Sequence, residues 1–200
     1  NKYNFTDAES DLDGDGLSAI QEFEYGTSPA YADTDGDTLS DGWEMENQRN
    51  PLVSDYQISL GGAHGCVLDD SGVICWGWNP DGQTNVPELS NPSEIAVGGS
   101  HSCALDDSGV ICWGKNSSGQ NDAPLLSNPV QISAGGSHTC AINDSGVICW
   151  GNNDNGQLNV PELVNPKKIS MGWVHSCALD DSGVVCWGGL VVVCCGGLCG

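Results

Sequence analysis

The feature that most constrains this chain is a repeat with a strict period of 37 residues. Histidines, two sets of cysteines and tryptophans each recur at this spacing, four times over: His64, His101, His138 and His175; Cys66, Cys103, Cys140 and Cys177; Cys75, Cys112, Cys149 and Cys186; Trp76, Trp113, Trp150 and Trp187. A fixed period without insertions is typical of a stack of like units that pack on their neighbours. Residues 52–188 are therefore predicted to form four consecutive units of one type.

The units are predicted to be β-structure, because short apolar runs alternate with Gly, Asp-Ser-Gly and Pro clusters. The unit that begins at Ile95 is expected to hold three strands, near 95–98, 101–105 and 110–113. A four-residue hairpin loop from Asp106 to Gly109, which ends in a left-handed glycine, would pair Leu105 with Val110. This register also places the two cysteines of each unit opposite one another.

Cysteines on facing strands of a hairpin are close enough for a disulfide. The predicted disulfides are Cys66–Cys75, Cys103–Cys112, Cys140–Cys149 and Cys177–Cys186. Zinc is the rival interpretation, but the separation of 9 residues differs from the C-x₂₋₄-C spacing of zinc knuckles. Eleven cysteines in 200 residues indicate maturation in an oxidising compartment, so a secreted or cell-surface protein is expected.

The units resemble the regulator of chromosome condensation repeats, in the segments GGSHSCALDDSGVICWGKNSSGQ (98–120) and GGSHTCAINDSGVICWGNNDNGQ (135–157). The resemblance covers residues 56–188 and implies blades of a β-propeller, which has seven blades in that family. The short units look more like the secreted bacterial branch, which includes a β-lactamase inhibitor with three-stranded blades. The expected fold class is mainly β, a partial or assembled propeller, preceded by a small domain with short helices.

Two acidic loops precede the repeats, and both have the spacing of a twelve-residue calcium loop. The first offers oxygens at positions 1, 3, 5, 7 and 12, and the second adds one at position 9. The side chains of alternate residues in such a loop converge on one large, hard cation, and a final bidentate Glu completes its coordination. The predicted Ca²⁺ ligands are Asp11, Asp13, Asp15, Leu17 (backbone carbonyl) and Glu22, and Asp33, Asp35, Asp37, Leu39 (backbone carbonyl), Asp41 and Glu44.

This segment resembles the bacterial thrombospondin type 3 repeats, for example in DTDGDTLSDGWEMENQRNP (33–51). The resemblance implies two calcium ions with a structural role. Two positions depart from the pattern: Thr38 stands where Gly is usual, and Ala19 offers no oxygen at position 9. An acidic, solvated linker is the alternative. Short helices are expected near 17–25, ending at Gly26, and near 39–47.

The charge balance also favours cations as ligands. The chain has 27 acidic and 5 basic residues, a net charge of −22, which argues against nucleic acid or an anionic membrane as partner. No apolar run is long enough to span a membrane. The composition changes near Asn50, so the predicted parts are 1–51, 52–188 and a β-prone, cysteine-rich tail, 189–200.

Other recurring residues are interpreted as structural. The repeated histidines are expected to link strands by hydrogen bonds, and the strand-end tryptophans to pack between neighbouring units. Trp43, Trp78 and Trp173 break the pattern and are expected to be exposed. Paired acids such as Asp106 and Asp107 lie in hairpin turns, so no enzyme is predicted.

Two features concern the surface and the tail. Sequons make Asn4, Asn116 and Asn143 candidate glycosylation sites. The tail, with Cys194, Cys195 and Cys199, either pairs with an open strand edge of this chain or of another, or is a non-native stretch.

The sequence thus predicts a non-catalytic, calcium-stabilised extracellular repeat protein. It is expected to act as a structural or adhesive surface module, such as a subunit of a fibre or appendage, and to join a protein partner or itself through open strand edges. The alternative is a secreted binding or inhibitor propeller that presents its loops to one protein partner.

Overall fold

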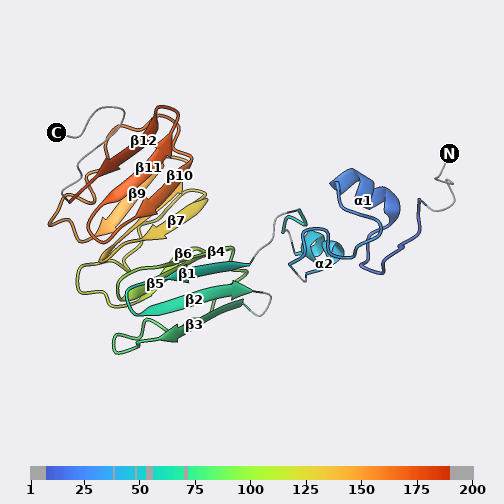
Figure 1. Cartoon of the computed structure of the whole chain (residues 1–200), viewed down its shortest axis with the longest axis horizontal. Helices are drawn as coiled ribbons and strands as arrows, with labels where there is room; N and C mark the ends of the chain where they lie inside the picture. Colours follow the sequence, from blue (N-terminus) through green and yellow to red (C-terminus); the bar gives the residue numbers. More distant parts are fainter. Residues whose placement is uncertain (1–7, 38, 48, 53–55, 70–71, 190–200) are drawn as a thin grey trace. The chain divides into compact units, whose positions relative to one another are not determined.

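The computed structural model describes residues 8–37, 39–47, 49–52, 56–69 and 72–189 (Figure 1). The chain divides into two compact units, Asn1–Tyr56 and Gln57–Gly200. Within the described residues, no helix is long and apolar enough to cross a membrane.

The first unit contains two short helices, α1 (Ala19–Tyr25) and α2 (Asp41–Glu46). Each begins after a serine. Ser18 precedes α1 and donates from its backbone N and its Oγ to the Gln21 side chain, whereas Ser40 Oγ accepts a bond from the backbone N of Trp43. Helix α1 ends at Gly26, which has the left-handed φ of 83°. Both helices lie where the sequence predicted them and are shorter by a few residues.

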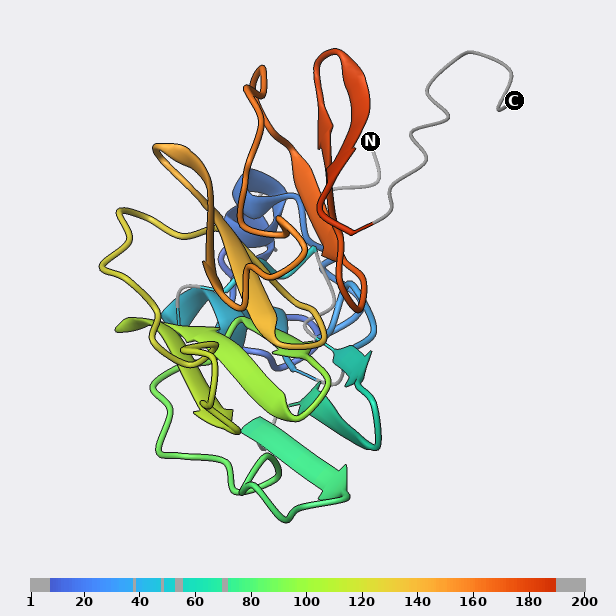
Figure 2. The ribbon, with the colours of Figure 1, turned by 90° about the vertical axis from the view of Figure 1, so that its left-hand side faces the viewer.

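The second unit consists of four three-stranded antiparallel sheets, which we call blades 1 to 4. Blade 1 contains β1 (Gln57–Leu60), β2 (His64–Asp69) and β3 (Gly72–Gly77); blade 2 contains β4 (Glu94–Val97), β5 (His101–Asp106) and β6 (Gly109–Gly114). Blade 3 contains β7 (Gln131–Ala134), β8 (His138–Asn143) and β9 (Gly146–Gly151); blade 4 contains β10 (Lys168–Met171), β11 (Ser176–Asp180) and β12 (Gly183–Trp187). Each blade is a simple meander with the strand order of the sequence, and consecutive blades lie side by side (Figures 1 and 2). The predicted fold class is confirmed.

The register of the second hairpin of each blade places its cysteines opposite one another. In blade 2, Leu105 pairs with Val110 and Cys103 with Cys112, as predicted. Asp106 also pairs with Gly109 (φ 114°), so the strands extend further into the turn than expected. Asp106 Oδ1 accepts bonds from the backbone N and the Oγ of Ser108, which explains the acidic residue as turn chemistry. The structure contains the disulfides Cys66–Cys75, Cys103–Cys112, Cys140–Cys149 and Cys177–Cys186.

The apolar core lies between blades rather than within one. The first cluster joins Cys66 and Leu68 of blade 1 to Ile95, Ala104 and Trp113 of blade 2. Two further clusters repeat this arrangement between blades 2 and 3 and between blades 3 and 4. A single blade therefore cannot bury its own apolar face, which is the physical reason for the repeat.

Buried polar links accompany these cores. His101 Nε2 lies 2.9 Å from Thr139 Oγ1 of the next blade. That hydroxyl donates to the backbone O of Gln120 at 3.1 Å, and Trp150 Nε1 donates to the same oxygen at 3.0 Å. Because the hydroxyl hydrogen is used on Gln120, the histidine must be the donor, in its Nε2–H form. His64 with Ser102 and His138 with Ser176 repeat the link.

Candidate metal centre

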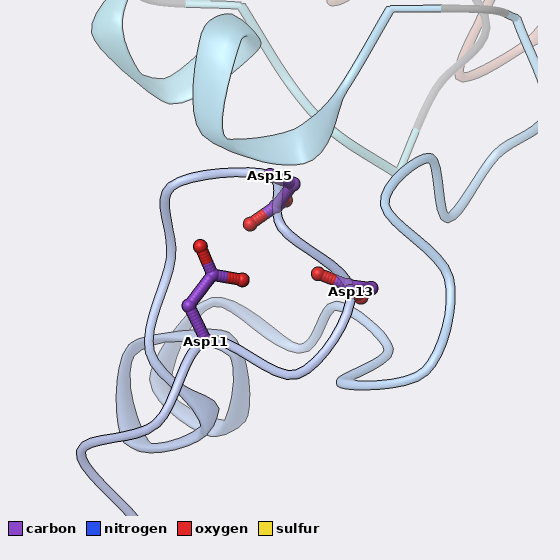
Figure 3. Close-up of side chains that lie close together, drawn as sticks. All are labelled: Asp11, Asp13 and Asp15. Atoms are coloured by element: carbon purple, nitrogen blue, oxygen red, sulfur yellow. The ribbon is translucent and has the colours of Figure 1, made fainter.

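The first acidic loop brings three carboxylates together. Asp11, Asp13 and Asp15 each offer an oxygen, and these oxygens lie within 4.8 Å of one another. Figure 3 shows the three side chains directed towards the space that the loop encloses. Like charges at this separation repel, and a cation in the site would relieve this repulsion.

Local hydrogen bonds give the loop this shape. Asp11 Oδ1 accepts a bond from Gly14 N at 2.7 Å, and Asp11 Oδ2 accepts one from Gly16 N at 3.0 Å. Gly14 and Gly16 have φ angles of 84° and 100°, which residues with a Cβ rarely adopt. Asp15 Oδ1 accepts from Leu17 N at 2.7 Å. The alternation of Asp with Gly therefore winds the backbone while it leaves carboxylate oxygens facing inward.

Glu22, from helix α1, is the most informative residue of the site. Its side chain is fully buried, and neither carboxylate oxygen has a hydrogen-bond partner among the described residues. Burial, and after it the nearby carboxylates of Asp13 and Asp15, raise the pKa of Glu22 to about 7. A buried carboxylate without a partner is strongly unfavourable unless a cation compensates it. Glu22 therefore fits the role of the position-12 ligand.

The second loop repeats the arrangement. Asp33, Asp35 and Asp37 also offer oxygens within 4.8 Å of one another, and Asp33 Oδ1 accepts bonds from Gly36 N and Asp37 N. Glu44, from helix α2, is fully buried like its counterpart Glu22. Thr38 lies outside the described residues.

Asp41, the predicted ligand at position 9, is held by a residue that the sequence did not single out. Its Oδ1 accepts from Thr34 N at 2.8 Å, and its Oδ2 accepts from Thr34 Oγ1 at 2.6 Å. Asp41 is fully buried and is not part of the close cluster of the other three aspartates. With its oxygens engaged in this way, it fits a water-mediated ligand better than a direct one. Ala19, its counterpart, is the first residue of α1.

The two loops are in direct contact. Asp15 Oδ2 accepts a bond from Gly42 N, in the first turn of α2, at 3.0 Å. A Cβ on Gly42 would come within 2.1 Å of the Asp15 carbonyl oxygen, so only glycine allows this approach. Sequence reasoning missed Gly42 and Thr34 because their roles depend on contacts between the loops.

The donor set fits calcium. Both loops offer only oxygen atoms, several of them charged, in the spacing that wraps a large cation, whereas Mg²⁺ prefers a tighter octahedron with several waters. Residues at positions 1, 3, 5 and 12 would hold the ion, together with the carbonyls of Leu17 and Leu39. Bound Ca²⁺ would neutralise the repulsion among these carboxylates.

Other predicted positions fall as follows. Asn116 is exposed, whereas Asn143 is 8% exposed and its Oδ1 accepts a bond from Ser145 N. Asn4 and the tail cysteines lie outside the described residues. Trp43, Trp78 and Trp173 are exposed as predicted. Three of the four strand-end tryptophans pack between blades, but Trp76 is 45% exposed.

Comparison with a known family identifies the repeats. The sequence model of the Regulator of chromosome condensation (RCC1) repeat matches residues 56–83, 93–120 and 130–157. The chain therefore contains RCC1-type repeats, which confirms this part of the resemblance. The structure adds a fourth unit, blade 4, beyond the matched residues. A search of the curated proteins finds no significant match.

Solved structures share the fold. The ectodomain of the Physcomitrella patens receptor kinase CR4 is 29% identical over 72% of this chain and 44% of its own, with a TM-score of 0.59. The CRINKLY WD40 ectodomain of the Arabidopsis thaliana receptor kinase ACR4 is 25% identical over 66% of this chain and 49% of its own, with a TM-score of 0.54. Yeast RCC1 (Prp20), solved with Kap60 bound, is 21% identical over 68% of this chain and 44% of its own, with a TM-score of 0.57. The chain thus spans about half the length of these proteins.

Proposed function

We propose that this chain is an extracellular protein-binding module in which Ca²⁺ orders the first unit and disulfide-stapled RCC1-type blades form the binding part. The observation that carries the calcium role is Glu22, a fully buried carboxylate without a hydrogen-bond partner among the described residues, close to three aspartates. Extracellular calcium is abundant enough to fill sites of even modest affinity.

Two further observations support the extracellular binding role. All eight cysteines of the blades are paired in disulfides, which persist in oxidising compartments. The two plant structures are ectodomains of receptor kinases. An ectodomain presents a surface to other molecules, so the similarity favours a binding role over catalysis. The bacterial branch with its inhibitor function stays a prediction.

The structural or adhesive role is the second candidate. The specific observation in its favour is the exposed apolar face of blade 1, where Ile58 and Leu60 are each 69% exposed. Such a face could attach this chain to another protein in a surface assembly.

Calorimetry tests the calcium role. Chelator-treated protein should take up two Ca²⁺ per chain, and Mg²⁺ at the same concentration should bind more weakly. Glu22→Gln should weaken one site by about tenfold or more, because the bidentate ligand is lost. Glu24→Gln is the matched control, since Glu24 lies on the exposed side of the same helix, and it should leave both sites unchanged. No uptake of Ca²⁺ at millimolar concentration would refute the proposal.

A further inference from the structure

The outward face of blade 4 carries residues that are buried at every other blade. Leu179 is 43% exposed, whereas its counterparts one, two and three periods earlier are 6%, 8% and 1% exposed: Ile142, Leu105 and Leu68. Those three lie in clusters that the next blade completes. Blade 4 thus presents the surface with which blades 1 to 3 each contact the next blade, and no further blade covers it among the described residues.

The polar group of that interface is present as well. His64, His101 and His138 are buried and each donates to a hydroxyl of the following blade, Ser102, Thr139 and Ser176. His175 is exposed, and its ring makes no hydrogen bond within the described part of the chain, although its backbone O accepts from Gly172 N at 2.9 Å. The face therefore offers an Nε2–H to a hydroxyl that the four blades do not supply.

Blade 1 of a second copy would be the obvious occupant, because its own outward face is apolar. Leu60 is 69% exposed and Trp76 is 45% exposed, whereas the counterparts Val97 and Trp113 are 6% and 8% exposed. However, Gly65 stands where Ser102, Thr139 and Ser176 stand in the other blades. Blade 1 therefore has no hydroxyl at the position that would accept a bond from His175.

A second link is also missing at this joint. Side chains at the start of the first strand accept a bond from a backbone N of the next blade: Gln57 from Ile95 (3.1 Å), Glu94 from Ile132 (2.7 Å) and Gln131 from Ile169 (2.8 Å). Lys168 holds this position in blade 4. An ammonium group has no acceptor, so it cannot pair with the Ile58 N of a second copy.

We infer that the outward face of blade 4 docks a blade of the same repeat type that carries a Ser or Thr hydroxyl, and that Gly65 and Lys168 keep blade 1 of a second copy away from it. An apolar contact between copies would bury a donor at His175 and the Ile58 N without acceptors, and each such group costs about 1–3 kcal/mol. The chain discriminates against joining end to end, and the partner is a hydroxyl-bearing blade.

Restoring the missing groups tests this inference on the full chain. The wild-type protein should stay monomeric in light scattering and sedimentation at about 100 µM. The double variant Gly65→Ser with Lys168→Gln supplies both the hydroxyl and the acceptor, and should form concentration-dependent, head-to-tail oligomers. Adding His175→Ala to this variant should weaken association by at least about tenfold, because the bond from the His175 ring to the new hydroxyl is lost.

Matched controls separate the hydroxyl from the added side-chain volume. A Cβ on Gly65 would meet Leu60 Cδ2 at 2.7 Å and the indole ring of Trp76 at 2.9 Å and 3.3 Å. Both side chains are exposed, so they can move aside. Gly65→Ala with Lys168→Gln should therefore fold and associate no more tightly than Lys168→Gln alone. Lys168→Gln alone changes one exposed residue and should associate weakly, at least about tenfold less tightly than the double variant.

Three results would overturn the inference. The first is association of the wild type as tight as that of the Ser-and-Gln variant. The second is a folded Ser-and-Gln variant that remains monomeric at the solubility limit. The third, which needs no change at Gly65, is a Lys168→Gln variant with no association at that limit. None of these results depends on calcium, so the proposed calcium role is tested separately.

Discussion

The substitution His101→Ala should destabilise the blades, and the same substitution at His175 should not. The His101 side chain is fully buried and donates to Thr139 Oγ1 at 2.9 Å. Alanine removes this bond, worth about 1 kcal/mol, and leaves a cavity between β5 and β8 that adds about 1–3 kcal/mol. We therefore expect a loss of about 2–4 kcal/mol for His101→Ala. His175 is exposed, so His175→Ala should change stability by less than about 0.5 kcal/mol.

Guanidinium unfolding under non-reducing conditions measures both variants. The midpoint should fall for His101→Ala with little change in slope, since the same surface is exposed on unfolding. Repeat arrays can unfold in parts, so amide exchange should also be followed in β5 and β8, where protection should fall first. Equal losses for the two variants, or a loss below about 0.5 kcal/mol for His101→Ala, would refute the role of the histidine as a link between blades.

Three further outcomes follow from the blades. Burial raises the pKa of Glu94 to about 7, whereas Gln57 and Gln131 accept the equivalent bond from the next blade without a charge. Glu94→Gln should therefore stabilise the protein by about 1–3 kcal/mol at pH 8, where Glu94 is ionised, and by little at pH 4. Thermal melts at the two pH values measure this. Burial lowers the pKa of His101 and His138 to about 4, so on acidification the two histidines take up protons in the unfolded chain before they do in the folded protein. In the Glu94→Gln background, the free energy of unfolding should therefore be greatest above about pH 6.5 and should fall as the pH drops towards 4. Unfolding measured as a function of pH checks this. Replacing the disulfide of blade 2 by two alanines should cost at most about 3 kcal/mol, because the closed loop is short, and calorimetric melting checks this limit.

The sequence predicted what is local and what is periodic. The turn from Asp106 to Gly109 sets the pairing of Leu105 with Val110, and this pairing places the cysteines opposite one another. The loop aspartates could be found for the same reason, because their spacing within twelve residues decides which side chains converge.

The remaining features depend on contacts between units. The bond from His64 to Ser102 joins residues 38 positions apart, one more than the period, and no local pattern shows it. The sequence signal for these bonds was a Ser or Thr directly after the histidine in blades 2, 3 and 4, where blade 1 has Gly65. The contact between Asp15 and Gly42 is likewise set by how the loops pack, which spacing within one loop does not determine.

The disulfides also determine how the blades would respond to a pulling force. Side-chain bonds and apolar contacts hold one blade to the next, whereas a covalent bridge closes the second hairpin within each blade. Under tension the array should therefore separate between blades first. Each disulfide spans 9 residues of a repeat of 37, and the chain between its cysteines cannot be extended while the bond is intact. About 28 residues of each repeat can therefore be extended. A released blade would add about 100 Å of contour length when oxidised and about 130 Å when reduced, which makes the redox state of the surroundings a control on extensibility.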